Sequence, residues 1–361
     1  MEILHNIPLL YILMFSCTLI FSALINNIFL KFAKTLGIRR NEGVQIRWSP
    51  TAKPALGGIS FYVIFLISFI CMELILNSTN TYLSDRKFLG VLAAITIAFI
   101  MGLADDAFDT KPLLKFLTQF SCAIILMITG TKISCFNSEF VNYTFTILWI
   151  VGLMNSINML DNMDAITTII SVVILSFVLC VNILNKMALS PIPFLSLGIL
   201  GSLAGFLIYN WHPSKMFMGD TGSQFLGVFL AIVGIDNCWN FPNMADTILP
   251  VTYESKSILI TALVFLIPLS DTITVVINRL SNGKSPFIGG KDHTTHHLFF
   301  NGITEKRIAF LYAGLSILAC YLAYQVIIET QWSILKFWLY AIYPLVVFIA
   351  LFSVTHLKRK A

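Results

Sequence analysis

The stretch Asn155-Ser-Ile-Asn-Met-Leu-Asp-Asn-Met-Asp164 places two carboxylates and three amides within ten positions. Hydrophobic runs flank it, residues 143–153 before it and residues 165–184 after it, and with them the chain can cross a bilayer twice. A charged side chain at the bilayer centre costs roughly 2.5 to 3.5 kcal/mol on insertion scales, so acids near a span usually face a cation, a ligand or one another. The stretch therefore predicts a polar site between two membrane helices, with a hydrated loop as the simpler alternative.

The composition is that of a membrane protein. Of the 361 residues, 57% are hydrophobic and only 11% are charged, which excludes a soluble globular domain. We expect an all-α, multi-pass helix bundle that forms one integral membrane domain over residues 1–361, with the lipid bilayer as a partner and no nucleic acid. Cys135 and Cys238 both fall in predicted outer loops, but a disulfide between them is not favoured. The first residues lack the positive region of a signal peptide, so the first apolar run is expected to remain as a span.

The membrane spans are predicted from apolar runs near the roughly 20-residue length needed to cross a bilayer. Such runs cover residues 7–30, 58–77, 88–104, 112–130, 143–160, 165–184, 191–209, 222–239, 257–277, 308–328 and 333–354. We therefore expect about 11 transmembrane helices, with 10 as the alternative. Interior proline residues such as Pro268 are tolerated in spans and are not expected to split them.

The distribution of Lys and Arg predicts the orientation. Most of the 23 Lys and Arg residues fall in alternate loops on one side of the predicted bundle. The positive-inside rule makes that side cytoplasmic, which puts the N-terminus outside and the C-terminus inside. The polar motifs described below then all lie on cytoplasmic loops, and the membrane is expected to be the inner (plasma) membrane.

Two of these motifs come early in the chain. Lys53-Pro-Ala-Leu-Gly-Gly58 precedes the second span, where paired glycines permit close backbone approach and helix-start amides can hold an anion. Asp105 and Asp106 end the third span, where the negative end of the helix dipole disfavours anions, so a metal or Lys115 is expected to neutralise them. For the first motif the alternative is an ordinary helix start. For the second it is a solvated acidic turn in which Asp109 or Thr110 caps the next helix.

Two further clusters contain oxygen ligands of the kind that Mg²⁺ accepts. Asn158, Asp161 and Asp164 are spaced by three, so a helical turn would present them on one side. Asp220 lies between two glycines and either caps the eighth helix or binds a metal beside a phosphate. Phe217 or Trp211 could then stack on a base.

The last motif is Lys291-Asp-His-Thr-Thr-His-His297. A zinc site is not favoured, because the spacing lacks the HExxH pattern and threonines are poor ligands. Histidines beside a lysine suit the binding of a diphosphate better. Loop histidines with no role in chemistry are the alternative.

Taken together, these five motifs, in this order and on one predicted side, resemble those of the polyprenyl-phosphate N-acetylhexosamine-1-phosphate transferases of glycosyltransferase family 4. The resemblance covers about residues 53–298. It implies transfer of a sugar 1-phosphate, with GlcNAc-1-phosphate as our choice, from a UDP-N-acetylhexosamine to undecaprenyl phosphate. UMP is released in this reaction, which begins lipid-linked cell-surface polysaccharide synthesis. It also implies a Mg²⁺ cofactor, with Mn²⁺ as a substitute, and leaves a homodimer open.

The resemblance also implies roles for individual residues. The metal ligands it implies are Asp220 and Asn158 or Asp161. The catalytic residues it implies are Asp105, Asp106, Asp161, Asp164 and Lys115, and the substrate-binding residues are Lys53, Asn210, Phe217, Lys291, His293, His296 and His297. A general base is the least compelling of these roles, because a phosphate monoester with a second pKa of about 6 is already mostly ionised at pH 7.

The sequence departs from the family pattern in two places. Asn162 and Ala165 replace the usual glycines, and two threonines separate the first and second histidines of the last motif. These changes argue against the peptidoglycan branch, so a phospho-N-acetylmuramoyl-pentapeptide transferase is kept as an alternative only. The other alternative is an ion-coupled transporter, which predicts acids in the middle of discontinuous helices.

Overall fold

The computed structural model of this protein describes residues 7–36, 53–76, 82–241, 250–286 and 290–357. These residues form an all-helical bundle, as predicted, in which Ala55 and Phe217 make an isolated β-bridge. The first helices are α1 (Ile7–Leu36), α2 (Gly57–Leu76), α3 (Arg86–Phe108), α4 (Pro112–Thr129), α5 (Glu139–Leu160), α6 (Ile166–Leu184) and α7 (Pro191–Asn210). They are followed by α8 (Gly219–Gly234), α9 (Pro250–Val264), α10 (Leu266–Ser281), α11 (Thr294–Phe300), α12 (Glu305–Ile328) and α13 (Ile334–Val354).

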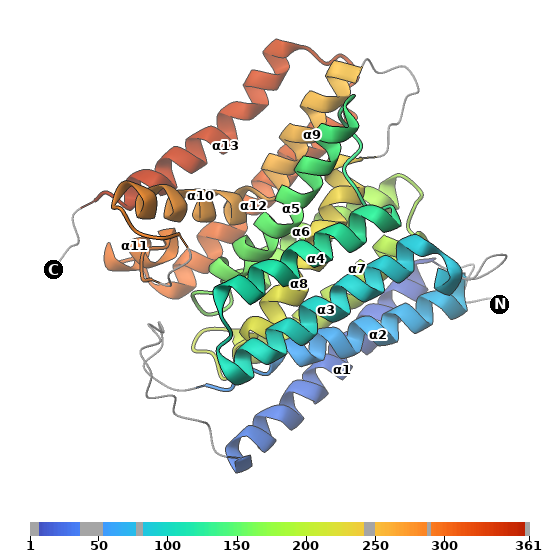
Figure 1. The fold of residues 1–361 in the computed structure, drawn as a ribbon, viewed down its shortest axis with the longest axis vertical. Coiled ribbons are helices and arrows are strands. Elements are labelled where there is room, and N and C mark those ends of the chain that lie inside the picture. The colour runs from blue at the N-terminus through green and yellow to red at the C-terminus, as the bar shows by residue number, and fades with distance from the viewer. Residues whose placement is uncertain (1–6, 37–52, 77–81, 242–249, 287–289, 358–361) are drawn as a thin grey trace.

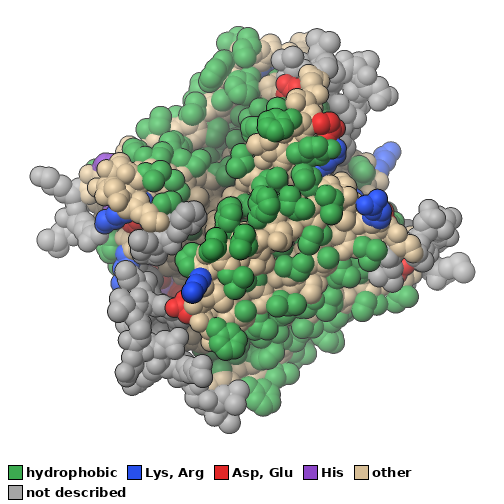
Figure 2. Space-filling view, viewed as in Figure 1, with side chains coloured by type: hydrophobic (Ala, Val, Ile, Leu, Met, Phe, Trp, Pro, Cys, Tyr) green, Lys and Arg blue, Asp and Glu red, His purple; other side chains and the backbone are tan. Residues whose placement is uncertain are grey.

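The helices agree with the predicted number of spans. Within the described residues, 10 helices are long and apolar enough to cross a membrane, or up to 11 if a bent pair counts as one span. On the face shown in Figure 2, hydrophobic side chains cover the middle of the bundle and charged side chains gather towards its margins. This distribution suits an apolar bilayer core between two polar interfaces. Cys135 and Cys238 are both unpaired thiols, in agreement with the expectation of no disulfide.

The ninth span is not the continuous helix that we predicted over residues 257–277. The chain breaks at Phe265, between α9 and α10, and the two helices meet at 82°. Pro268 supplies a physical reason, because it has no N–H to donate to the Val264 carbonyl four residues earlier and its ring would clash there. The expectation that Pro268 leaves the span unbroken is therefore wrong. As Figure 1 shows, α10 runs across the bundle, and α11 lies beside it.

Helix α8 is the centre of the bundle, and α2, α3 and α5 pack around it. Its span is 94% buried, the largest share of any candidate span in the described residues. Two neighbouring helices approach its first turn through glycines. A Cβ atom on Gly58 would lie 2.1 Å from the Gly222 nitrogen, and one on Gly102 would lie 2.3 Å from the Asp220 carbonyl oxygen. Only residues without a side chain permit this backbone contact, which fixes where α8 begins.

We therefore expect Gly102→Ala to destabilise the protein by about 1 to 3 kcal/mol, because the added methyl group must displace the backbone that carries Asp220. Activity should fall with stability, since the start of α8 moves. Gly152→Ala is the matched control, because a Cβ atom at Gly152 meets nothing within 4 Å. Thermal unfolding of both variants in detergent checks the prediction, which fails if the two melt together.

Candidate active site

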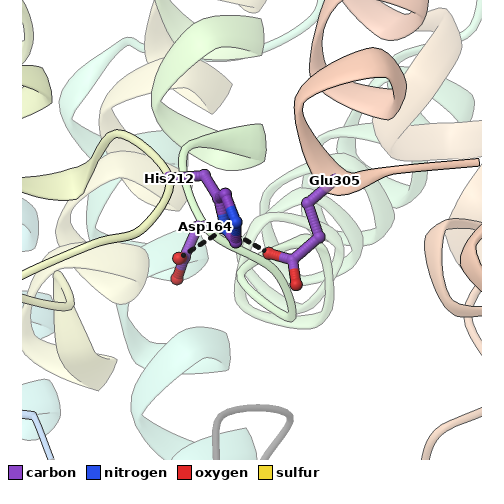
Figure 3. A group of neighbouring side chains, drawn as sticks. All are labelled: Asp164, His212 and Glu305. Carbon is purple, nitrogen blue, oxygen red and sulfur yellow. Dashed lines mark hydrogen bonds and ion pairs between the residues drawn. The ribbon is translucent and has the colours of Figure 1, made fainter.

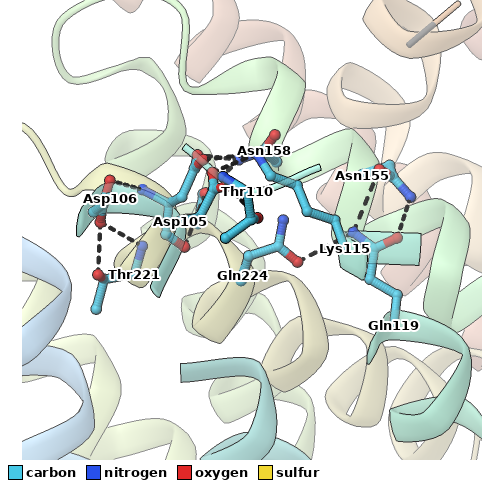
Figure 4. Close-up of polar contacts among 11 residues, drawn as sticks. Asp105, Asp106, Thr110, Lys115, Gln119, Asn155, Asn158, Thr221 and Gln224 are labelled. Atoms are coloured by element: carbon cyan, nitrogen blue, oxygen red, sulfur yellow. Dashed lines mark hydrogen bonds and ion pairs between the residues drawn. The ribbon is translucent and has the colours of Figure 1, made fainter. Parts of the chain in front are cut away.

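The site is built at one end of the bundle, where α8 begins and α3 ends. Asp106, in the last turn of α3, holds the start of α8 with both of its carboxylate oxygens (Figure 4). Its Oδ1 accepts a hydrogen bond from the Asp220 backbone N–H at 2.9 Å. Its Oδ2 accepts from the Thr221 N–H at 2.9 Å and from Thr221 Oγ1 at 2.6 Å. A carboxylate at the positive end of α8 satisfies amides that the helix itself cannot pair.

This arrangement changes the position expected for Asp220. The alternative that Asp220 caps α8 through its own side chain is wrong, because Met218 is the N-cap residue and Asp220 lies inside the first turn. The Asp220 carboxylate instead faces two other helices. Its Oδ1 accepts from Asn158 Nδ2 at 2.6 Å, and its Oδ2 accepts from Lys115 Nζ at 3.1 Å. Three helices, α4, α5 and α8, therefore meet at this one carboxylate.

Lys115 neutralises part of the acidic pair, as the sequence suggested. Its ammonium group contacts the carboxylates of both Asp105 and Asp220. Asp105 is buried and also accepts from Thr110, through the backbone N–H at 2.9 Å and Oγ1 at 2.5 Å. The capping alternative for Asp109 or Thr110 is wrong, because Lys111 is the N-cap residue of α4 and no side chain caps it.

Amide side chains extend the polar cluster into the bundle (Figure 4). Asn155 Nδ2 donates to Gln119 Oε1 at 2.7 Å, and Gln119 Nε2 donates to Gln224 Oε1 at 3.1 Å. Each residue comes from a different helix, so the chain of amides ties α4, α5 and α8 together below the carboxylates. Such connected polar groups hold a site rigid when every member is paired.

Asp161 lies at the end of α5, beside these carboxylates. Burial, followed by the negative charges of Asp220 and Asp106, raises the pKa of Asp161 to about 8. The carboxyl group therefore resists ionisation unless a further positive charge is present. The donor set fits a hard divalent cation, because Asp220, Asp161 and the Asn158 amide oxygen are the ligand types that Mg²⁺ and Mn²⁺ accept.

Asp164 belongs to a second cluster rather than to the first. Helix α5 ends at Leu160, so the expectation that one helical turn presents Asn158, Asp161 and Asp164 together is wrong. Asp164 Oδ1 accepts from Ser214 Oγ at 2.7 Å, and Oδ2 accepts from the Ser214 N–H at 2.9 Å.

His212 joins this second cluster to α12 (Figure 3). Its Nδ1 lies 3.2 Å from Asp164 and 2.7 Å from Glu305. These two carboxylates and the ring nitrogen are close enough to one another to hold a metal ion. Lys53 also belongs to this cluster, because its Nζ is 3.6 Å from Asp164 and brings a positive charge to the carboxylates.

Phe217 lies beside this cluster, on the segment that leads into α8. Its backbone pairs with the 53–58 segment, donating to the Pro54 carbonyl and accepting from the Gly57 N–H. Lys53 Nζ is 5.0 Å from the centroid of the Phe217 ring. The first and fourth sequence motifs are thus neighbours in space and place an aromatic face and a cation together.

Asn210 is buried and its amide is occupied by the protein. Its Oδ1 accepts from the Ala165 N–H and from Thr168 Oγ1, while its Nδ2 donates to the Met216 carbonyl. It therefore fixes the start of α6, where Ala165 has the positive φ of 65° that favours glycine. The uridine contact of Asn210 stays a prediction.

The histidine motif forms the start of α11. Thr295 Oγ1 donates to Asn162 Oδ1 at 2.6 Å, which places this helix beside the turn that carries Asp161. His293 and His296 are both buried, and burial, followed by the charge of His293, lowers the pKa of His296 to about 4. The His297 ring packs edge-on against Phe300, and Lys291 is exposed.

Several residues of the site were not singled out from the sequence. His212, Glu305 and Thr221 have no signal of their own in the sequence. Asp271 had one, because it is an acid inside a predicted span and such residues are functional candidates by default. The span over residues 257–277 was predicted from its apolar residues alone, so Asp271 was not among the candidates.

The fold and the site together define a polytopic membrane protein with a carboxylate-rich polar site at one end of its helix bundle. The family model for glycosyl transferase family 4 matches residues 88–237 of the chain. This match and the curated relatives confirm the predicted family resemblance.

Three relatives illustrate the resemblance. A probable undecaprenyl-phosphate N-acetylglucosaminyl 1-phosphate transferase of Bacillus subtilis is 28% identical over 70% of this chain and 67% of its own length. A decaprenyl-phosphate N-acetylglucosaminephosphotransferase of Mycobacterium leprae is 25% identical over 72% of this chain and 70% of its own. A phospho-N-acetylmuramoyl-pentapeptide-transferase of Staphylococcus carnosus is 29% identical over 57% of this chain and 68% of its own.

Proposed function

We propose that this protein transfers N-acetylglucosamine 1-phosphate from UDP-N-acetylglucosamine to undecaprenyl phosphate and releases UMP. The single observation that carries the proposal is the convergence of Asn158 and Lys115 on the Asp220 carboxylate at one end of the bundle. An acid held there with one lysine and with Asp161 nearby is suited to a cation-assisted transfer between phosphates. The names of the relatives support the same class of reaction and its polyprenyl phosphate acceptor.

The chemistry demands charge neutralisation more than covalent help. The acceptor and the donor diphosphate are both anions, and their approach requires positive groups that hold both in line. Mg²⁺ would supply Lewis-acid stabilisation of the diphosphate when held by Asp220, Asn158 and Asp161. Lys115 contributes a fixed positive charge from α4, and the start of α11 brings His293 and His296 to the same end of the bundle.

The nucleotide part of the UDP-sugar donor is proposed to bind at Phe217. Its ring offers a face for the uracil base, and the nearby Lys53 ammonium and Asp164 carboxylate can donate to and accept from a base edge. The site is proposed to open to the cytoplasm, because the Lys- and Arg-rich loops lie on that side in the predicted orientation.

A transporter is the less favoured function. The bent α9–α10 pair is a feature that transporters share, and Asp271 lies within it. That acid, however, is paired with His293 and Thr294, while the remaining acids of the site lie at helix ends.

We expect the purified protein to release UMP from UDP-N-acetylglucosamine only when undecaprenyl phosphate and a divalent cation are both present. EDTA should abolish the release, and excess Mg²⁺ should restore it, because the diphosphate charge is otherwise unbalanced. A parallel assay with UDP-N-acetylmuramoyl-pentapeptide tests the peptidoglycan alternative. UMP release that persists in EDTA would contradict the metal assignment, and release from the pentapeptide donor alone would replace the proposed substrate.

A further inference from the structure

A buried carboxylate that the proposed chemistry does not use lies beneath the histidine motif. Asp271 is 1% exposed and lies on α10, the helix that crosses the bundle. Its Oδ2 is 2.8 Å from His293 Nδ1, and its Oδ1 accepts from the Thr294 N–H at 2.8 Å and from Thr294 Oγ1 at 2.5 Å. All three contacts go to the start of α11, so a single acid connects α10 to the motif.

The contact with His293 determines which ring nitrogen can meet a substrate. An ionised carboxylate in a buried site requires hydrogen-bond donors, and Thr294 supplies two of them to Oδ1. The donor that faces Oδ2 is His293 Nδ1, which must therefore carry a proton. His293 Nε2 is then the ring atom left for a ligand, as in metal and catalytic sites where a carboxylate fixes the tautomer of a histidine.

The structure assigns Asp271 as a positioning residue that orients His293 so that its Nε2 donates to an oxygen of the donor diphosphate. Nε2 donates a hydrogen bond only in the ring form that carries a hydrogen on each nitrogen. This inference rests on the proposed function, because that function gives His293 a phosphate ligand.

The loop is held independently on both sides of His293. Arg279, also on α10, donates from Nε and Nη2 to the two oxygens of Asp292 at 2.7 and 2.8 Å. Thr294 Oγ1 contacts the Tyr312 hydroxyl of α12 at 2.6 Å. A change confined to the Asp271 charge should therefore alter the histidine ring and leave the loop in place.

Asp271→Asn tests the assignment with a side chain of the same shape. The Asn oxygen should face Thr294, which presents two donors, so its NH₂ group faces His293 Nδ1 and reverses the direction of that hydrogen bond. We expect kcat for UMP release to fall on the order of 100-fold, with little change in KM for UDP-N-acetylglucosamine. Tyr312→Phe, which removes one hydroxyl from the same buried network but leaves the contact between Asp271 and His293, is the matched control and should lose far less kcat than Asp271→Asn. An Asp271→Asn protein with wild-type kcat would overturn the assignment.

A second measurement needs neither substrate nor turnover. The full chain, labelled with ¹⁵N-histidine and purified in detergent, is compared with Asp271→Asn by NMR, and His293→Gln identifies the His293 signals. We expect a protonated Nδ1 in the wild type and an unprotonated Nδ1 in Asp271→Asn. An unprotonated Nδ1 in the wild type overturns the inference. The wild-type spectrum therefore tests the inference even if the Asp271→Asn variant does not fold. A wild-type protein that shows the protonated Nδ1 but releases no UMP would refute the proposed function alone.

Discussion

Asp220→Asn is expected to reduce UMP release by about three orders of magnitude, the scale seen when one charge-stabilising group of an active site is removed. The substitution keeps the shape of the side chain but removes the negative charge that a divalent cation needs from this position. Folding should be preserved, because the backbone of Asp220 is held by Asp106 and not by its own side chain. The measurement is UMP release at saturating Mg²⁺, accompanied by Mn²⁺ binding followed by electron paramagnetic resonance.

Asp105→Asn is the comparison for this prediction. Asp105 contacts Lys115 and Thr110, and the phosphate acceptor is already mostly ionised at pH 7, so no base is required to activate it. This variant should therefore keep measurable turnover and bind Mn²⁺. Full turnover by Asp220→Asn would refute the metal assignment, and complete inactivity of Asp105→Asn with Mn²⁺ still bound would restore a general base.

Asp106→Ala is expected to lower both stability and activity. Its two oxygens pair the Asp220 N–H, the Thr221 N–H and the Thr221 hydroxyl, and removal of a helix cap of this kind costs about 1 to 2 kcal/mol. Activity should fall by roughly 100-fold, because a small displacement of a catalytic group can cost that much. Thermal unfolding in detergent and UMP release are measured on the same preparation.

Thr221→Val separates the two roles that Asp106 could have. It removes one of the three contacts to Asp106 and leaves the carboxylate in place. If Asp106 acts by holding α8, Thr221→Val should lose part of the stability and part of the activity together. If Asp106→Ala instead melts like the wild type while losing activity, Asp106 acts in the chemistry and the positioning role is wrong.

Particular residues show which features of the fold and the site could be predicted from the sequence. A metal or Lys115 was expected to neutralise Asp105 and Asp106 from the helix dipole and from charge repulsion, and the structure contains the pairing of Lys115 with Asp105. The path of α10 was not expected, because Pro268 alone does not state whether a span bends or breaks. Asp271 could have been singled out as an acid inside a predicted span, but its partners could not, because His293 and Thr294 are more than twenty residues away and become neighbours only in the folded chain.

The sequence by itself determined the membrane class, the approximate number of spans and the five polar motifs, because hydrophobicity and residue spacing are local properties that folding does not alter. Only the tertiary structure decided which groups each carboxylate contacts. Asp106 and Asp220 are both acids in polar motifs at helix ends, yet one pairs with backbone amides and the other faces Asn158 and Lys115. Asp161 and Asp164 are three residues apart, yet they belong to different clusters, because α5 ends at Leu160 and helical spacing no longer holds beyond it. The partners of a buried charge come from distant segments, and their positions depend on how the helices pack.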